Sequence, residues 1–427
     1  LPPKALKSLG LAFRDGICAG LAQRELLFGE VRWFASPRRL AVLISEVQLN
    51  TPDRDIEVLG PPAERARDEA GNWTPAAAGF ARKQGVGPEQ LQSIDTPKGP
   101  RLGLRRTEQG VATRDCLNDI IHESIHSLPI PKRMRWGARR VEFVRPVHWV
   151  VAMLGEDADH GEVLGLPTGN RTRGHRFHSS GEITLQRPEE YPSALADAYV
   201  VADFEQRRNM ILEQVEVEAS ALHAKAVIDP DLLDEVTGLV EWPVALTGSF
   251  EERFLAVPAE ALVSAMKAHQ KYFHLVDGEG ALQSNFITLC NIESKDPVQV
   301  IAGNERVIRP RLADAAFFFE TDKKIPLATR TESLESIVFQ QQLGSLRDKT
   351  QRVVALAGAL APRVGADAAL AERAALLSKA DLTTEMVLEF ADMQGIAGSY
   401  YALHDGEEQE VASALAHQYW PKSVSYT

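Results

Sequence analysis

The spacing of hydrophobic residues in the first part of the chain alternates between helical and extended patterns. Apolar side chains recur every three or four positions from Leu6 to Leu21, which predicts an amphipathic helix over 4–28. The apolar run 40–44 follows a Ser-Pro-Arg-Arg break and predicts a buried strand. Residues 145–187 alternate short apolar runs with Gly and Pro, which again favours strands.

Residues 51–111 differ from the segments that flank them. They are dense in Pro, Gly and Ala, and we expect a small inserted subdomain here. A helix should begin after Thr74-Pro75, because Thr is a good N-cap and Pro fits the first helical turn. The flanking segments, 1–50 and 112–300, then form one mixed α/β region.

The pattern changes again toward the end of the chain. A long charged helix is predicted over 189–226 and a second helix over 258–271, followed by two strands joined by the turn Asp277-Gly278-Glu279-Gly280. From about residue 298 Ala and Leu predominate at helical spacing, so 301–427 is predicted to be a helical domain. The fold class expected is α+β with several domains, with a boundary near 300–330.

Composition narrows the classes of protein. The 427 residues carry 47 Lys and Arg against 59 Asp and Glu, a net charge of −12, which argues against indiscriminate coating of nucleic acid. No apolar run approaches the roughly 20 residues that span a bilayer, so no membrane association is expected. Three widely spaced cysteines without a CxxC pair favour a reducing, cytoplasmic location. Because the chain opens Leu1-Pro2-Pro3 without Met, we expect a fragment.

Familiar nucleotide and hydrolase motifs are absent from the sequence. It contains no GxxxxGK[ST] loop, no GxGxxG between a strand and a helix, no GxSxG and no HExxH. The sequence therefore predicts no ATP cradle of these types and no catalytic residue.

The dipeptide His404-Asp405 raises the possibility of a metal site, because metal-dependent phosphohydrolases named for this pair use it as ligands. Such a site needs a further His upstream and an Asp downstream. Residues 325–403 contain no His, and no Asp follows Asp405. In the stretch 376–381, Lys379 stands where such folds carry His, and a protonated lysine is a poor ligand. A surface turn is the favoured interpretation, with His404 and Asp405 kept as weak metal candidates.

Basic segments provide the candidate binding residues. Residues 132–145 hold six cations and one acid, a concentration that is typical of a phosphate-contacting patch, with Trp136 and Phe143 as stacking faces. A solvated loop whose arginines pair with acids elsewhere is the alternative.

A second basic segment covers 170–178. Arg171 and Arg173 are two residues apart and should share one face of an extended segment, while Gly174 would let the backbone approach a ligand. Arginines that pair across domains would explain the same pattern. On the helix predicted over 258–271, Lys267 and Lys271 fall at i and i+4, which favours an anionic partner, although Lys271 also suits a helix end. The candidate contacts are Lys132, Arg133, Arg135, Arg139, Arg140, Arg171, Arg173, His175, Arg176, Lys267 and Lys271.

Several segments resemble the beta subunit of bacterial glycyl-tRNA synthetase, and they occur in order along the whole chain. The matching segments are 1–6, 34–40 (FASPRRL), 128–137 (LPIPKRMRWG), 173–177 (RGHRF), 239–243 (LVEWP), 291–296, 307–315 (VIRPRLADA) and 339–346.

The resemblance implies an α2β2 ligase that attaches glycine to tRNA(Gly) with ATP. The alpha subunit would carry the active site with its ATP and Mg, so no cofactor is expected on this chain, and the beta subunit would mainly handle tRNA. It also implies an N-terminal mixed α/β region like the editing-type domain of the phenylalanyl-tRNA synthetase large subunit, followed by an all-helical HD-like domain. An HD-type metal-dependent phosphohydrolase, or a scaffold that only stabilises the alpha subunit, are the alternative functions.

Overall fold

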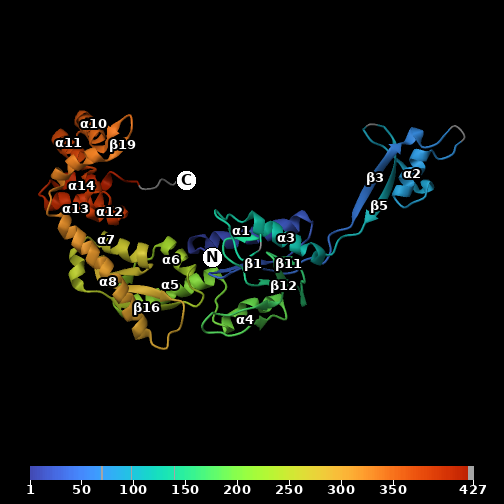
Figure 1. Cartoon of the computed structure of the whole chain (residues 1–427), viewed down its shortest axis with the longest axis horizontal. Coiled ribbons are helices and arrows are strands. Elements are labelled where there is room, and N and C mark those ends of the chain that lie inside the picture. Colours follow the sequence, from blue (N-terminus) through green and yellow to red (C-terminus); the bar gives the residue numbers. More distant parts are fainter. Residues whose placement is uncertain (69–70, 98, 139, 422–427) are drawn as a thin grey trace. The chain divides into compact units, whose positions relative to one another are not determined.

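The computed structural model describes residues 1–68, 71–97, 99–138 and 140–421 (Figure 1). The chain forms two compact units, Leu1–Asp203 and Phe204–Thr427, and both contain helices and strands. This mixture confirms the α+β class. The units divide the chain at 203/204, whereas the predicted boundary near 300 falls inside helix α8 (Pro297–Asp322).

Two helices form the centre of the first unit. Helix α1 (Leu6–Gln23) packs against α3 (Thr113–Ser127), beside the antiparallel pair β1 (Val31–Ser36) and β2 (Arg39–Ile44). A Cβ at Gly20 would come within 2.7 Å of the Ile120 side chain, so glycine allows the two helices to approach closely. The helix predicted over 4–28 ends earlier than expected, at Gln23. The strand predicted over 40–44 is β2, but its apolar residues are only partly buried.

The inserted segment has a sheet and a small core of its own. Strands β3 (Arg54–Pro62), β5 (Arg101–Glu108) and β4 (Gln92–Ile94) form an antiparallel sheet against α2 (Pro75–Lys83). Thr74 accepts a hydrogen bond from the Ala77 amide and caps α2, as predicted. Buried Ala77, Ala81, Leu91, Leu102 and Leu104 form its core.

Short strand pairs complete the first unit. Three are antiparallel pairs: β6 (Met134–Arg135) with β7 (Glu142–Phe143), β9 (Met153–Leu154) with β10 (Asp157–Ala158), and β13 (Arg171–Thr172) with β14 (Ile183–Thr184). A three-stranded sheet has the order β11 (Glu162–Val163), β12 (Leu166–Gly169), β8 (Val150–Val151). In this sheet β12 is antiparallel to β11 and parallel to β8. Helix α4 (Tyr191–Asp197) follows.

The helix predicted over 189–226 is two helices, α4 and α5 (Phe204–Ala221). They are separated where Tyr199 adopts a left-handed backbone with φ 61°, and buried Val200 and Ala202 lie in the non-helical segment that follows. Burial of these apolar residues thus overrides helix propensity.

The second unit begins with a four-stranded antiparallel sheet. Its order is β15 (Lys225–Ala226), β17 (Phe273–Val276), β18 (Leu282–Cys290), β16 (Val244–Ser249). Helices α5 and α6 (Pro230–Thr237) share a hydrophobic core with this sheet. The predicted Asp-Gly-Glu-Gly turn joins β17 to β18, and Gly280 takes the left-handed conformation there, φ 88°. The helix predicted over 258–271 is α7 (Ala259–Ser264) continued by a π-helix (Ala265–Gln270), and it ends where Lys271 turns left-handed.

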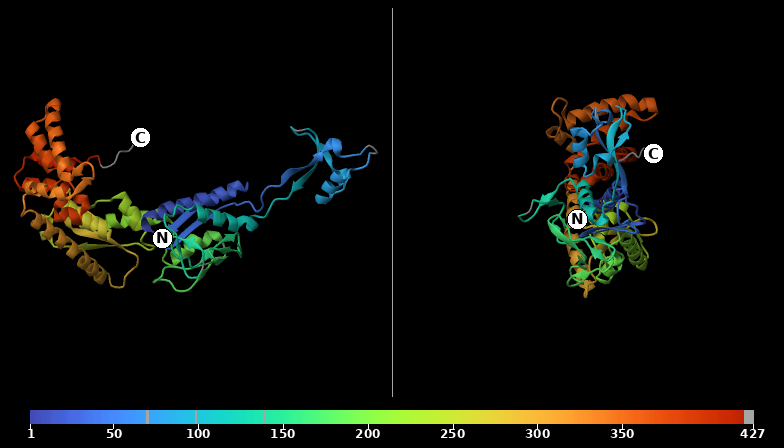
Figure 2. Two further views of the ribbon diagram at one scale, coloured as in Figure 1. Left: turned by 45° about the horizontal axis from the view of Figure 1, so that its top comes forward. Right: turned by 90° about the vertical axis from the view of Figure 1, so that its right-hand side faces the viewer.

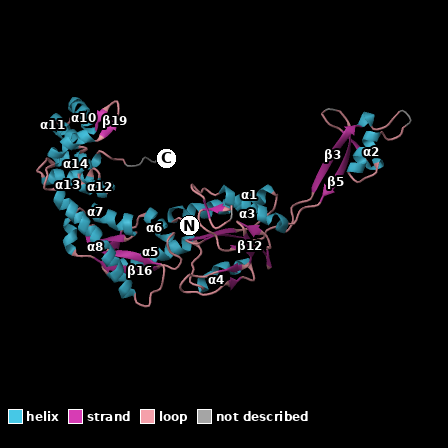
Figure 3. Ribbon diagram, viewed as in Figure 1, coloured by secondary structure: helices cyan, strands magenta, loops and turns pink. Residues whose placement is uncertain are grey.

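Helices fill the rest of the second unit (Figure 3). They are α8, α9 (Leu327–Arg330), α10 (Leu346–Leu360), α11 (Ala368–Leu377), α12 (Glu385–Glu389), α13 (Ile396–His404) and α14 (Gln409–His417). One hairpin, β19 (Val338–Gln340) with β20 (Gly344–Ser345), lies among them, so 301–427 is not all-helical. Short 3₁₀ segments, some of them directly adjoining α-helices, occupy Pro3–Ala5, Ala63–Arg65, Pro88–Gln90, Pro188–Glu190, Glu252–Ala256, Thr331–Ser336, Ala361–Val364, Ala380–Thr383 and Ala391–Met393.

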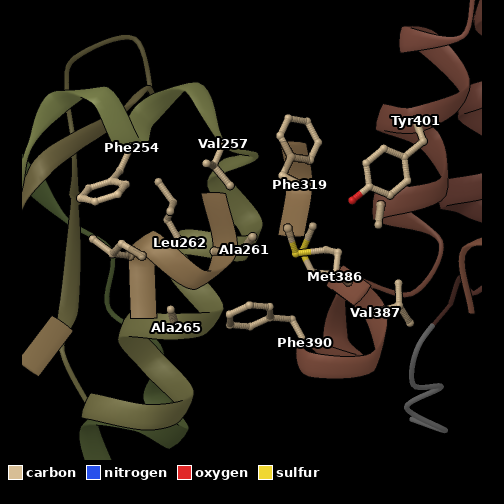
Figure 4. Close-up of a cluster of buried hydrophobic side chains, with 14 of the residues drawn as sticks. Phe254, Val257, Ala261, Leu262, Ala265, Phe319, Met386, Val387, Phe390 and Tyr401 are labelled. Atoms are coloured by element: carbon tan, nitrogen blue, oxygen red, sulfur yellow. The ribbon is translucent and has the colours of Figure 1, made fainter. Parts of the chain in front are cut away.

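One hydrophobic core continues from α7 into the helices that follow. Ala261 and Leu262 of α7 lie near Met386 and Phe390, and Phe319 of α8 packs at the same cluster (Figure 4). The predicted boundary near 300 therefore crosses a shared core. No helix within the described part of the chain is both long enough and apolar enough to span a membrane.

Candidate nucleic-acid interface

The basic segment 132–145 forms a short hairpin in the first unit. Arg135 of β6 faces Glu142 of β7, and its Nε donates to the Glu142 carboxylate at 2.6 Å. The register thus pairs the cluster's only acid with one of its arginines. Phe143, an expected stacking face, is buried in the core with 7% exposed, and Trp136 packs beside the same core. Neither ring is available to stack on a base, because both pack in or against the hydrophobic core of the unit.

Arg133 hydrogen-bonds to the backbone of its own unit. Its Nη2 donates to the carbonyl oxygens of His126 at 2.9 Å and Ile125 at 3.3 Å, at the end of α3. A cation at this position satisfies otherwise unpaired carbonyl groups and opposes the negative end of the helix dipole. Lys132, Arg140 and Arg145 are exposed, and no carboxylate among the described residues pairs with them. Arg139 lies outside the described residues.

Arg171 and Arg173 share one acidic partner. Arg171 at the start of β13 and Arg173 just after it donate to the two oxygens of Glu182, at 3.3 and 3.2 Å. Their spacing of two residues does place them on one face. Hydrogen bonds from Arg173 and then Arg171 lower the pKa of the Glu182 carboxyl. The pair therefore braces the ends of the loop between β13 and β14.

The middle of this loop is tightly packed against its own unit. A Cβ at Gly174 would come within 2.5 Å of the Ala198 Cβ, so glycine there permits contact within the protein and not the ligand contact expected from the sequence. His175 is 1% exposed, and its Nδ1 accepts from the amides of Phe177 and His178. Buried Arg39 donates to the Gly174 carbonyl. His175 is thus a structural centre of the loop.

The outer edge of the same loop presents a cation beside an aromatic ring. The Arg176 guanidinium lies 5.8 Å from the Phe177 ring centre, and Phe177 is 76% exposed. No carboxylate in the described ranges pairs with Arg176. An aromatic face next to a cation suits an unpaired base and its phosphate. Sequence reasoning named Arg176 but missed Phe177, although adjacent Arg and Phe in a loop were the available signal.

Lys267 and Lys271 lie in the second unit, and both face acids. Lys267 pairs with Asp229, the N-cap of α6, and Lys271 Nζ lies 3.2 Å from a Glu235 oxygen. The α-helical i, i+4 geometry expected for them does not form, because Lys267 lies in a π-helix and Lys271 follows its end in a left-handed conformation. Lys267 lowers the pKa of Asp229. These two lysines belong to the second unit, whereas the other candidate cations belong to the first.

Comparison with known proteins identifies the family. A sequence model described as glycyl-tRNA synthetase beta subunit matches residues 1–426. The glycine–tRNA ligase beta subunit of Chromohalobacter salexigens is 56% identical over 425 residues, and that of Marinobacter nauticus is 53% identical over 428 residues. This chain belongs to the glycyl-tRNA synthetase beta subunit family. The two matches include 100% and 99% of this chain, which spans 62% and 61% of the length of these relatives.

Within this beta-subunit chain, His404 and Asp405 have separate places. His404 is the exposed last residue of α13, and the Asp405 carboxylate accepts from the Leu327 amide at 2.6 Å, where α9 begins. Across the described ranges, no group of three or more His, Cys, Asp or Glu is placed to hold a metal ion. The donor set therefore gives no support to a hydrolase centre, and Asp405 has a structural partner.

Two buried carboxylates were missed as polar centres of the helical part. Asp322 is 1% exposed and accepts from Arg330, from the amides of Glu385 and Met386, and from the Tyr401 hydroxyl. Asp381, also 1% exposed, accepts from the amides of Gly395 and Gly398 through one oxygen. Burial raises the pKa of the Asp381 carboxyl. Asp322 is already fully engaged in holding helix ends together, so its carboxylate has no free position for a ligand.

Proposed function

We propose that this chain binds tRNA for a glycine–tRNA ligase, while ATP-dependent attachment of glycine to tRNA(Gly) takes place on an alpha subunit. The observation that carries the proposal is the exposed Arg176–Phe177 pair on a braced loop. Family membership supplies the reaction in which such binding would serve.

The loop is suited to binding because its conformation is already fixed. Glu182 holds Arg171 and Arg173, and buried His175 accepts two loop amides. A preorganised loop loses little conformational entropy when a ligand binds to its edge. Phe177 can then stack on an unpaired base while Arg176 contacts phosphate.

Exposed cations elsewhere in the first unit would add phosphate contacts. Lys132, Arg140 and Arg145 have no acidic partner among the described residues, unlike Arg135. Phosphate contacts supply affinity and orientation, and they make binding depend on salt. Selective contact by a few cations on a chain of net charge −12 favours reversible binding of tRNA.

In this proposal the alpha subunit carries out the ATP-dependent reaction. The sequence has no phosphate-loop motif, and the described residues offer no metal cluster, so no catalytic step is assigned to this chain. The alpha subunit would hold ATP and Mg in an α2β2 assembly in the cytoplasm. The helical part would keep an HD-like scaffold without its metal chemistry, and the first unit an editing-type scaffold.

The test measures tRNA(Gly) binding to the chain across a series of salt concentrations. Phe177→Ala should weaken binding by about 1–3 kcal/mol, the usual contribution of one base–aromatic stack. Arg176→Ala should weaken binding and reduce the magnitude of the log–log salt slope by about 1. Arg306→Ala, at an exposed cation on α8, is the matched control and should change neither value.

Other results would select an alternative function. Unchanged affinity in both loop variants would remove this loop from the interface. If the chain forms a complex with the alpha subunit but neither chain nor complex binds tRNA, it is a scaffold. Nucleotide hydrolysis with added Mn²⁺ that is lost in His404→Ala would instead indicate an HD-type phosphohydrolase.

A further inference from the structure

Exposed apolar side chains concentrate on α10 and the hairpin before it. Four lie in line along the helix and the turn that follows, namely Val353 at 39%, Leu356 at 57%, Leu360 at 45% and Val364 at 78% exposed. Phe339 of β19, 40% exposed, adds a fifth, because Lys349 of α10 lies 4.3 Å from the centre of its ring. We call these five residues the α10 stripe.

The stripe has the spacing of a helix–helix seam. Val353, Leu356 and Leu360 are separated by three and then four residues, so they fall on one face of α10. The opposite face is already covered, because a Cβ at Gly358 would come within 2.0 Å of Glu372 on α11. Helices α10 and α11 lie at the end of the second unit remote from its sheet in every view (Figures 1 and 2). The stripe thus lies on a face of α10 that no element among the described residues covers.

Charge around the stripe is basic, against the sign of the whole chain. Residues 346–364 hold four cations and one acid. The acid, Asp348, accepts from the Ser345 amide in a capping box, and Arg347 pairs with Glu335. The remaining cations are Lys349, Arg352 and Arg363, and none has a carboxylate partner among the described residues.

We propose that the α10 stripe docks an amphipathic helix of another protein chain, one whose apolar seam is bordered by acidic residues. Aliphatic side chains at seam spacing fit the apolar face of a helix, and the flanking cations select acidic borders. A second copy of this chain fits poorly, since antiparallel pairing would set Lys349 and Arg352 against Arg363. Nucleic acid fits poorly too, because the stripe offers aliphatic groups where bases need aromatic ones.

The test uses two designed helical peptides of about 20 residues, a length at which an isolated helix can form. Both carry the same leucine seam, and one has Glu and the other Lys at the border positions. Binding to the full chain is followed by fluorescence anisotropy. The Glu-bordered peptide should bind at least about tenfold more tightly than the Lys-bordered one.

Variants locate the contact. Leu356→Gln should weaken binding of the Glu-bordered peptide by about tenfold, since a central apolar anchor is lost. Val217→Gln, at a 68% exposed position on α5, is the matched control and should leave the affinity unchanged. The double variant K349E/R352E should reverse the preference between the two peptides. Far-UV circular dichroism checks that each variant is folded.

Contrary results are equally defined. Equal affinity for both peptides, or full affinity in Leu356→Gln, would overturn the proposal. Dimerisation of the chain that Leu356→Gln abolishes would assign the stripe to a second copy, and displacement of the peptide by tRNA would assign it to nucleic acid. The proposal is separate from tRNA binding by the first unit, so Phe177→Ala should leave peptide affinity unchanged.

Discussion

Buried carboxylates show how single residues determine both stability and what the chain can bind. Asp322 ends α8 and meets Arg330 at 2.9 Å, where the side chains are 1% and 11% exposed. Its oxygens also cap the start of α12 through two amides. Removing one partner of such a pair leaves the other charge buried and unpaired, which costs more than the pair contributes.

Replacement of Asp322 by Ala should therefore lower the free energy of unfolding by about 3–5 kcal/mol. Tyr401→Phe removes a single hydrogen bond to the same carboxylate and should cost only about 1 kcal/mol. Urea unfolding followed by circular dichroism measures both values. Similar, small losses in the two variants would mean that Asp322 does not organise this junction.

His274 on β17 should make stability depend on pH. Burial, and then the Lys267 charge, lower the pKa of its imidazole. The unfolded chain consequently binds more protons between that lowered pKa and about 6.5. This contribution to stability is fully present above about pH 6.5 and is lost as the pH falls.

His274→Gln should accordingly lose less stability than the natural chain between pH 7.5 and 5, the range about the ordinary imidazole pKa. Thermal unfolding at several pH values measures the difference. His404→Gln, at an exposed helix end, is the control for loss of a histidine. An unaltered pH profile in His274→Gln would contradict the assignment.

For single residues, the sequence predicted which side chains carry charge better than it predicted the groups with which they pair. It identified Arg133 and Arg173 as candidate contacts. In the structure, however, Arg133 donates to a carbonyl oxygen at the end of α3, and Arg173 donates to Glu182 across a strand pair. Such partners depend on tertiary contacts that spacing does not specify. Phe177 was missed because composition alone does not show that a phenylalanine in a loop stays exposed.

Among elements, prediction succeeded where the signal was local. The cap at Thr74 and the Asp-Gly-Glu-Gly turn each form as expected, since a few adjacent residues determine them. The single helix over 189–226 was wrong, because buried apolar residues between α4 and α5 override helix propensity. The helix over 258–271 does form, but its change to π geometry over Ala265–Gln270 is not visible in the periodicity.

Helix α10 provides a prediction at this scale. The Ser345 hydroxyl accepts from the Asp348 amide, and the Asp348 carboxylate accepts from the Ser345 amide, so the helix start is capped reciprocally. Ser345→Ala should lower the free energy of unfolding by about 1 kcal/mol. Ser336→Ala, where the hydroxyl donates to a backbone carbonyl, is the control and should change it by less than about 0.5 kcal/mol. Urea unfolding compares them, and equal losses would show that the cap contributes nothing specific.

For the whole molecule, the inserted segment offers the clearest test of how the chain is assembled. Asn50 and Ala112 form an antiparallel bridge, and the Thr113 amide donates to the Leu49 carbonyl at 2.8 Å. The inserted segment thus begins and ends at neighbouring positions of the first unit, and it has its own sheet and core. Insertions with adjacent ends and separate cores are those that a fold tolerates losing.

Deleting 52–110 and joining the ends through a short glycine linker should therefore leave the rest of the chain folded. We expect the near-UV circular dichroism of the remaining aromatic side chains and a cooperative thermal transition to persist, because the α1–α3 core makes no use of the deleted residues. The isolated segment 50–112 is the complementary control and should show strand content of its own. Aggregation of the deleted chain, or loss of its cooperative transition, would mean that the insertion is required for the first unit to fold, and tRNA binding could then not be assigned separately to its basic loops.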